Sequence, residues 1–223
     1  MDKTLLRVAL GKFVSGALLI GALIFIPAGT WHFWNGWLFL GVLLIPMFIC
    51  ELILLVRCPE LLRKRLNARE AQQEQRLLVA LNGLMFLAGF AAAGLDHRFQ
   101  WLPVSRMVSI TAAAVFLLAY LLYAEVLREN VYLSRTIEIQ EHQQVIDTGL
   151  YGIVRHPMYS VTLILFLSMP LILGSLVSFL IFLIYPVLTV CRIKNEEQVL
   201  EEGLEEYADY KKRVRYRLFP LIW

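Results

Sequence analysis

The sequence carries little charge for its length. Only 17% of its 223 residues are Asp, Glu, Lys or Arg, whereas 59% are hydrophobic. Average soluble domains have about 25% charged and about 45–50% apolar residues. A water-soluble globular domain is therefore excluded, and so is a disordered chain, because disorder requires low hydrophobicity and high charge. The composition predicts a protein that lies mostly within a membrane.

Short motifs of several enzyme classes are also missing. The sequence has no GxGxxG or GxxxxGK[ST] loop for phosphate groups, no HExxH zinc motif and no GxSxG nucleophile turn. Its four histidines and three cysteines lack the spacing of metal ligands, and the odd number of cysteines predicts unpaired thiols. We therefore expect no metal site, and no nucleic-acid partner is expected either.

Long apolar runs are what the sequence does have. Four of them fit the ~20 helical residues that one membrane span needs, namely Leu5–Ile26, Trp37–Val56, Leu77–Leu95 and Val108–Leu127. The last run, Met158–Cys191, is too long for one span and short for two. Pro170 and Gly174 lie near its middle, and Pro disrupts a helix. We expect a helical hairpin, Met158–Leu173 followed by Ser175–Cys191; the alternative is one tilted, kinked helix.

The basic residues predict the orientation in the membrane. All but two of the 21 Lys and Arg residues fall before or early in the first run, after the second, after the fourth or after the last. The exceptions are Arg98 and Arg106, between the third and fourth runs. Because Lys and Arg concentrate in cytoplasmic segments, both termini are expected in the cytoplasm. A single final span would place the basic tail outside, which favours the hairpin.

The sequence thus predicts an all-α fold, a polytopic membrane helical bundle of four spans plus a C-terminal helical hairpin. We divide the chain into an N-terminal four-span membrane region, residues 1–127, and a C-terminal region, residues 128–223, with the hairpin and a cytoplasmic tail.

Two polar segments flank the predicted hairpin, Val145–Tyr159 and Arg192–Glu197. Each has an ordinary structural interpretation, as the capped start of a helix and as an ion pair between Arg192 and Glu196 on one helix face. A hairpin, however, returns to the side where it began and brings the two segments together. The prediction is a cytoplasmic-side pocket with an Arg, two carboxylates, a His and two Tyr.

A specific pattern runs through these segments. It contains Thr148-Gly-Leu-Tyr151, Arg155-His-Pro-Met-Tyr159, Arg192-x-x-x-Glu196-Glu197, Tyr207-x-x-Tyr210 and a tail ending at Pro220. In this order and separation, the pattern resembles the isoprenylcysteine carboxyl methyltransferase family in its bacterial type. These are integral-membrane enzymes that use S-adenosylmethionine. The resemblance covers about residues 128–223 and implies that this part is the methyltransferase region.

The resemblance implies roles for individual residues. Arg192 matches an arginine placed at the methyl acceptor, and Glu196 a carboxylate that binds the cofactor; we take both as catalytic candidates. The cofactor-binding candidates are Gln144, Val145, Ile146, Tyr151, His156, Pro157, Tyr159, Glu196 and Glu197. The cofactor that the resemblance implies is S-adenosylmethionine, and the implied product is S-adenosylhomocysteine. The partners that it implies are membrane lipids and a lipidic or small hydrophobic acceptor, and the expected location is a bacterial inner membrane.

Other functions stay open at the level of sequence. The acceptor can be a carboxylate of the isoprenylcysteine kind, a phospholipid amine or a thiol. An NADPH-dependent membrane reductase is an alternative, because sterol reductases have a similar C-terminal layout; here Met158 stands at the Asn of their R-H-x-N-Y motif. A non-enzymatic membrane protein is the third hypothesis, although such a protein would carry ionisable groups deep in several spans. The oligomeric state is left open.

Overall fold

The computed structural model describes residues 3–66, 73–130, 132 and 143–223. Within these residues the backbone is helical apart from connections and one isolated bridge between Pro103 and Ser175. The elements are α1 (Lys3–Ala28), α2 (Trp34–Arg57), α3 (Pro59–Leu66), α4 (Gln73–Phe99), α5 (Arg106–Glu129), the 3-10 helix η1 (Gly149–Gly152), α6 (Pro157–Ile172), α7 (Leu176–Phe182), α8 (Ile184–Gly203) and α9 (Tyr207–Arg213).

The four predicted N-terminal spans are confirmed as α1, α2, α4 and α5, and each helix extends beyond its apolar run. Among the described residues, five helical segments are long and apolar enough to cross a membrane, the fifth being Leu176–Gly203, which combines α7 and α8. The fold is a polytopic helical membrane bundle. The sequence did not predict the short helix α3, whose Leu62 packs with Leu5 and Leu55 at the ends of α1 and α2.

The last apolar run forms the predicted hairpin, and the single kinked helix is excluded. α6 continues through Pro170 and ends at Ile172, and Gly174 then turns the chain with a positive φ of 77°, a conformation that favours glycine. Ser175 caps α7 by accepting a hydrogen bond from the Ser178 N–H at 3.0 Å. α7 and α8 are separated at Leu183. Pro186, near the start of α8, lacks the N–H that would continue α7.

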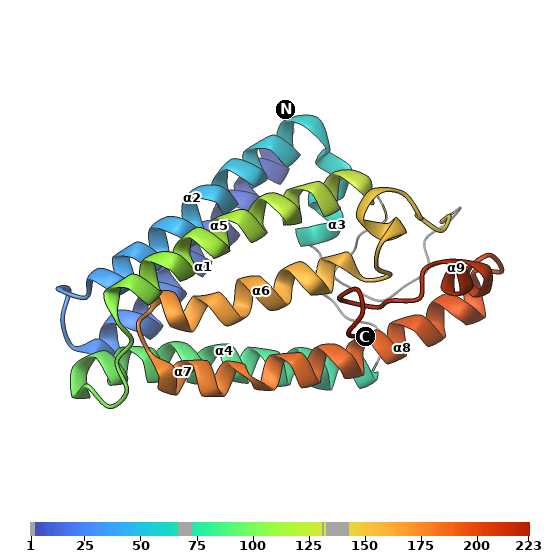
Figure 1. Cartoon of the computed structure of the whole chain (residues 1–223). Helices are drawn as coiled ribbons and strands as arrows, with labels where there is room; N and C mark the ends of the chain where they lie inside the picture. The colour runs from blue at the N-terminus through green and yellow to red at the C-terminus, as the bar shows by residue number, and fades with distance from the viewer. Residues whose placement is uncertain (1–2, 67–72, 131, 133–142) are drawn as a thin grey trace.

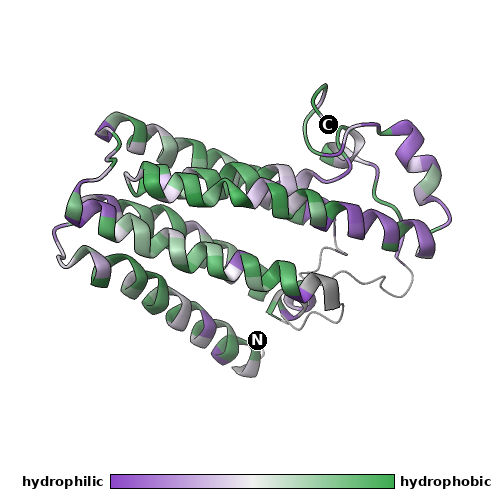
Figure 2. Cartoon of the chain, turned by 90° about the horizontal axis from the view of Figure 1, so that it is seen from below, coloured by the Kyte–Doolittle hydropathy of each residue, from purple (hydrophilic) through white to green (hydrophobic). Residues whose placement is uncertain are grey.

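The helices run alongside one another, and the connections α1–α2, α4–α5 and α6–α7 meet at one end of the bundle (Figure 1). We call this the far end, since the polar segments of the chain lie at the other. Two backbone hydrogen bonds join the connections there, from Val104 N–H to the Gly174 carbonyl (2.9 Å) and from Leu176 N–H to the Leu102 carbonyl (3.1 Å). Figure 2 shows hydrophobic residues along most of the helices and hydrophilic ones on the last part of α8 and on α9.

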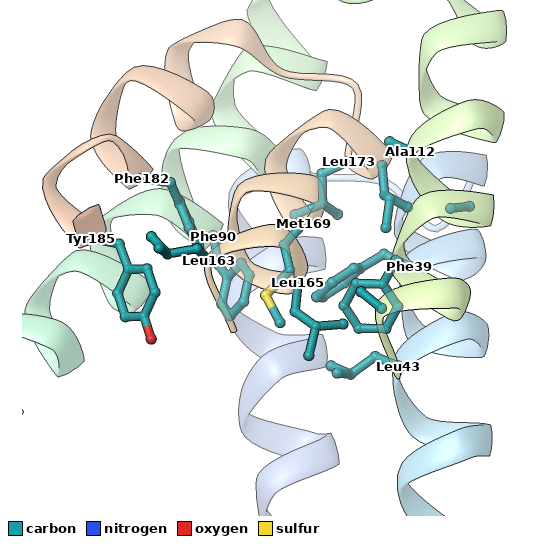
Figure 3. Close-up of a cluster of buried hydrophobic side chains, with 14 of the residues drawn as sticks. Phe39, Leu43, Phe90, Ala112, Leu163, Leu165, Met169, Leu173, Phe182 and Tyr185 are labelled. Carbon is teal, nitrogen blue, oxygen red and sulfur yellow. The ribbon is translucent and has the colours of Figure 1, made fainter. Parts of the chain in front are cut away.

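Buried side chains hold the helices together around α6. Figure 3 shows Phe39, Phe90 and Phe182 packed with Leu163 and other α6 residues in this cluster. α6 is apolar on every side, as expected of a helix enclosed by others, and ten of its residues are buried. The neighbouring helices therefore hold α6, and with it both of its ends, in a fixed position.

Two buried polar side chains fasten the far end. Asp96 is only 1% exposed, and it accepts hydrogen bonds from the Ser175 hydroxyl (2.5 Å) and the Leu102 N–H (2.8 Å). Asn35 donates to the Ile172 carbonyl at 2.7 Å and to the Ser109 hydroxyl at 3.0 Å. Buried polar groups are stabilising only when they are paired. These contacts fix the hairpin turn to α2, α4 and α5.

Candidate functional site

A pocket lies at the polar end of the bundle, where α5 ends, α6 begins and α8 leaves the apolar layer. Its walls come from the segment before α6, the start of α6, the last turns of α8, and α9. The lining residues are Asn130, Tyr132, Gln143, Gln144, Val145, Ile146, Tyr151, Arg155, His156, Met158, Tyr159, Arg192, Glu196, Val199, Leu200, Leu204, Tyr207 and Tyr210. The hairpin thus brings the two polar segments together, as predicted.

The loop before α6 is shaped by a glycine and a carboxylate. Gly149 has a positive φ of 51°, and a Cβ at this position would lie 1.4 Å from Oε1 of Glu129. The close approach lets Glu129 accept a hydrogen bond from the Leu150 N–H at 2.9 Å. Asp147 in the same loop pairs with Arg213 of α9 at 2.7 Å. These contacts fix the path of the backbone that leads to Tyr151 and His156.

Glu197 is a buried anion behind the pocket wall. Its side chain is 5% exposed, and its Oε1 lies 2.7 Å from Arg155 Nε and 3.2 Å from His156 Nε2. Its Oε2 accepts a hydrogen bond from Arg217 Nε at 2.9 Å. A buried charge is tolerated when it is paired and hydrogen-bonded, and Glu197 meets both conditions. The carboxylate therefore fastens the segment before α6 and the tail to α8.

The tail after α9 runs back along the start of α6. Arg155 Nη1 donates to the carbonyls of Val214 and Arg215, each at 2.8 Å. The backbone N–H of His156 donates to the Arg217 carbonyl at 2.9 Å. The tail thereby holds Arg155 and His156 from the side away from the pocket.

Tyr159, Glu196 and Arg192 form a connected polar group that faces the pocket. The Tyr159 hydroxyl donates to Glu196 Oε2 at 2.6 Å and accepts from Arg192 Nε at 2.9 Å. Arg192 and Glu196 lie one turn apart on α8 and so share a face, while Tyr159 reaches them from α6. The arrangement presents a guanidinium and a carboxylate at fixed positions, bridged by a phenol.

Three buried tyrosines add aromatic surface. Tyr210 donates its hydroxyl to the Tyr151 carbonyl at 2.8 Å, and its ring centroid lies 5.7 Å from that of Tyr207. Burial raises the pKa of the Tyr151, Tyr207 and Tyr210 phenols. All three are therefore neutral near physiological pH, and each offers a hydrogen-bonding group rather than a charge.

Most of the residues predicted for the site line the pocket, but two do not. The lining includes Gln144, Val145, Ile146, Tyr151, His156, Tyr159, Arg192 and Glu196. Pro157 is buried as the first residue of α6, and Glu197 lies behind Arg155 and His156.

Sequence reasoning gave no role to several lining residues. These are Asn130, Tyr132, Arg155, Met158, Val199, Leu200, Leu204, Tyr207 and Tyr210. Arg155, Tyr207 and Tyr210 stand within the motifs and could have been singled out. The apolar Val199, Leu200 and Leu204 have no distinguishing signal.

Comparisons with known proteins bear on the same region. Residues 105–206, somewhat less than half of the chain, match a family model described as Phospholipid methyltransferase. The match begins just before α5 and ends just before α9. The Delta(14)-sterol reductase TM7SF2 of Mus musculus is 34% identical over 91 residues, which cover 40% of this chain and 22% of the mouse protein. The chain thus spans about a fifth of that relative. The α5–α8 region, with both polar segments, is therefore similar to a family of membrane methyltransferases.

Proposed function

We propose that this chain is an integral-membrane methyltransferase that uses S-adenosylmethionine and methylates a lipidic or small hydrophobic acceptor. One observation carries the proposal. Both motifs line one pocket, and there the Tyr159 hydroxyl hydrogen-bonds both Glu196 and Arg192. The match to phospholipid methyltransferases over residues 105–206 supports the same reaction class.

The lining residues fit such a cofactor. Tyr151, Tyr207 and Tyr210 supply aromatic surface, and Val145 and Leu200 supply apolar surface, which suit a purine. Glu196 supplies a carboxylate, which suits hydroxyl or ammonium groups. When bound, S-adenosylmethionine supplies a methyl group on a positively charged sulfur.

The protein's own contribution to the reaction is mainly positioning. Methyl transfer from sulfur is an in-line displacement, so aligning the acceptor provides much of the rate. The Arg192 guanidinium can orient a carboxylate or phosphate as a fork, and Tyr159 fixes its Nε. A carboxylate acceptor is already ionised, whereas an amine or thiol must lose a proton. We propose His156, which lines the pocket and is hydrogen-bonded to Glu197, as the base for those acceptors.

The pocket's place in the bundle supports a cytoplasmic-side site. In the sequence, all but two of the 21 Lys and Arg residues lie before or early in the first apolar run or after the second, fourth and last runs, and the positive-inside rule assigns these segments to the cytoplasm. Both termini would then be cytoplasmic, and a bacterial inner membrane is the proposed location. Within this class, isoprenylcysteine-type carboxylates, phospholipid amines and hydrophobic thiols are the candidate acceptors.

Two measurements test the proposal. S-adenosylhomocysteine is titrated into the purified protein in detergent by calorimetry, and binding is expected. The protein is then incubated with S-adenosylmethionine carrying a labelled methyl group and with lipid extracts, and mass spectrometry identifies the labelled product. Labelled carboxyl ester, amine or thioether would define the acceptor class. No binding of either S-adenosyl compound would overturn the proposal.

The similarity to the mouse sterol reductase favours one second candidate, an NADPH-dependent membrane reductase. The same protein preparation tests it. Tight binding of NADPH together with no binding of S-adenosylhomocysteine would replace the methyltransferase proposal with this one.

A further inference from the structure

The hydroxyls of Tyr207 and Tyr151 are buried polar groups of the site with no hydrogen-bond partner among the described residues. Tyr207 is 4% exposed and lines the pocket from the first turn of α9. Its hydroxyl oxygen is buried, yet it has no hydrogen-bond partner within the part of the chain that the structure describes. Buried hydroxyls are nearly always paired, because an unpaired one loses its hydrogen bonds to water without replacement.

Tyr210, on the same helix, is a buried tyrosine whose hydroxyl does have a structural hydrogen bond. Tyr210 lies one turn further along α9, is 2% exposed and donates its hydroxyl to the Tyr151 carbonyl at 2.8 Å. Its hydrogen bond joins α9 to the loop before α6. Tyr207 makes no such connection, so holding the fold together does not account for its hydroxyl.

The surroundings of the Tyr207 hydroxyl are charged. Burial, and after it the carboxylates of Glu197 and Glu196, raise the pKa of this phenol, and Arg155 acts in the opposite direction. The Tyr207 side chain packs with Val145 and Leu200, while its hydroxyl lies within the influence of these charged groups. A ligand group that suits this position is itself polar or charged.

We infer that Tyr207 is a ligand-binding residue whose hydroxyl hydrogen-bonds the charged amino-acid end of the S-adenosyl cofactor. The inference rests on the proposed function. A neutral phenol can donate to a carboxylate or accept from an ammonium, and the amino-acid end offers both groups. Tyr207 lies just beyond the region that matches the family model, so its role rests on its own geometry.

The test compares Tyr207→Phe with Tyr210→Phe in the full-length protein in detergent. Without ligand, Tyr207→Phe is expected to melt at the wild-type temperature or above, because it removes an unpaired buried hydroxyl. Tyr210→Phe is expected to melt lower, because the Tyr151 carbonyl loses its donor. A drop in the melting temperature of Tyr207→Phe as large as that of Tyr210→Phe would overturn the inference.

Calorimetry with two ligands locates the contact. Tyr207→Phe should weaken S-adenosylhomocysteine binding by about three- to tenfold, the effect of one hydrogen bond. It should leave binding of 5′-methylthioadenosine, which lacks the amino-acid end, unchanged. Unchanged binding of both ligands, or equal weakening of both, would overturn the assignment. Failure of the wild-type protein to bind S-adenosylhomocysteine would instead overturn the proposed function, so the two failures are distinguishable.

Discussion

The Nε of Arg155 lies 2.7 Å from Oε1 of Glu197, and both side chains are 5% exposed. The pair joins the loop before α6 to α8, and Arg217 adds the tail through the other carboxylate oxygen. Three segments that are distant in sequence thus meet at one buried anion. The wall formed by Arg155 and His156 depends on this anion being present.

Glu197→Gln should therefore destabilise the protein strongly. Removing one partner from a buried ion pair typically costs ~3–5 kcal/mol, because the remaining charges stay buried without compensation. We expect a clearly lower melting temperature in detergent and weaker binding of S-adenosylhomocysteine. Glu201→Gln, on the same helix, is the matched control. Glu201 pairs with Lys211 on the surface, and exposed pairs contribute little. Equal melting temperatures for the two variants would contradict this role of Glu197.

Arg192→Ala should separate transfer from cofactor binding. We expect methyl transfer to fall by at least two orders of magnitude, because alignment of the acceptor is lost. Binding of S-adenosylhomocysteine, measured by calorimetry, should change only severalfold. Lys194→Ala is the control, since Lys194 is exposed on the same helix. A parallel loss of transfer and of cofactor binding would show that Arg192 does not act on the acceptor alone.

Gly149→Ala should disturb the loop before α6. The added Cβ would collide with the Glu129 carboxylate, and the positive φ is unfavourable for alanine, at a cost of about 1–3 kcal/mol. We expect weaker S-adenosylhomocysteine binding and a lower melting temperature. Gly83→Ala on α4 provides the comparison, because no atom beyond the adjacent backbone of its own helix lies within 4 Å of its Cβ position. In a helix this change is stabilising or neutral, and a loss as large as that of Gly149→Ala would argue against a local effect.

The buried tyrosines predict a decline in stability at alkaline pH. Burial raises the pKa of Tyr151, Tyr207 and Tyr210 above the value of about 10 in the unfolded chain. Above pH 10 the unfolded state loses phenolic protons that the folded state keeps, so the free energy of unfolding falls as pH rises. Melting temperatures from pH 8 to pH 11 measure the decline. Tyr210→Phe should show a shallower decline than the wild-type protein; an equal slope would contradict the assignment.

Local sequence properties were sufficient to predict the long apolar helices. Apolar run length located the four N-terminal spans, and Gly174 marked the turn of the hairpin because its positive φ is a local property. Pro170 was a poorer guide to the break, since the last turn of α6 tolerates it. α3 was missed because it is short and contains charged residues.

The candidate site was predicted where its residues stand in motifs. Glu196 and Glu197 are adjacent in sequence, yet neighbouring residues on a helix point about 100° apart. Which of the two faces the pocket depends on the side chains that pair with the other. Glu197 pairs with Arg155 and Arg217, which come from segments that sequence alone does not place. Tyr207 and Tyr210 likewise differ only in what their hydroxyls meet.

The length of α6 has a consequence for how an acceptor reaches the site. α6 has 16 residues and α5 has 24, so at ~1.5 Å per residue α6 is ~24 Å long, shorter than the ~30 Å hydrocarbon layer. The Ser109 hydroxyl bonds the Leu171 carbonyl at 2.9 Å, which aligns the two helices at the far end. α6 therefore begins deeper than the level at which α5 ends. On the proposed function, an amphiphile can keep its tail among the lipids while its head group meets Arg192, without being lifted from the bilayer.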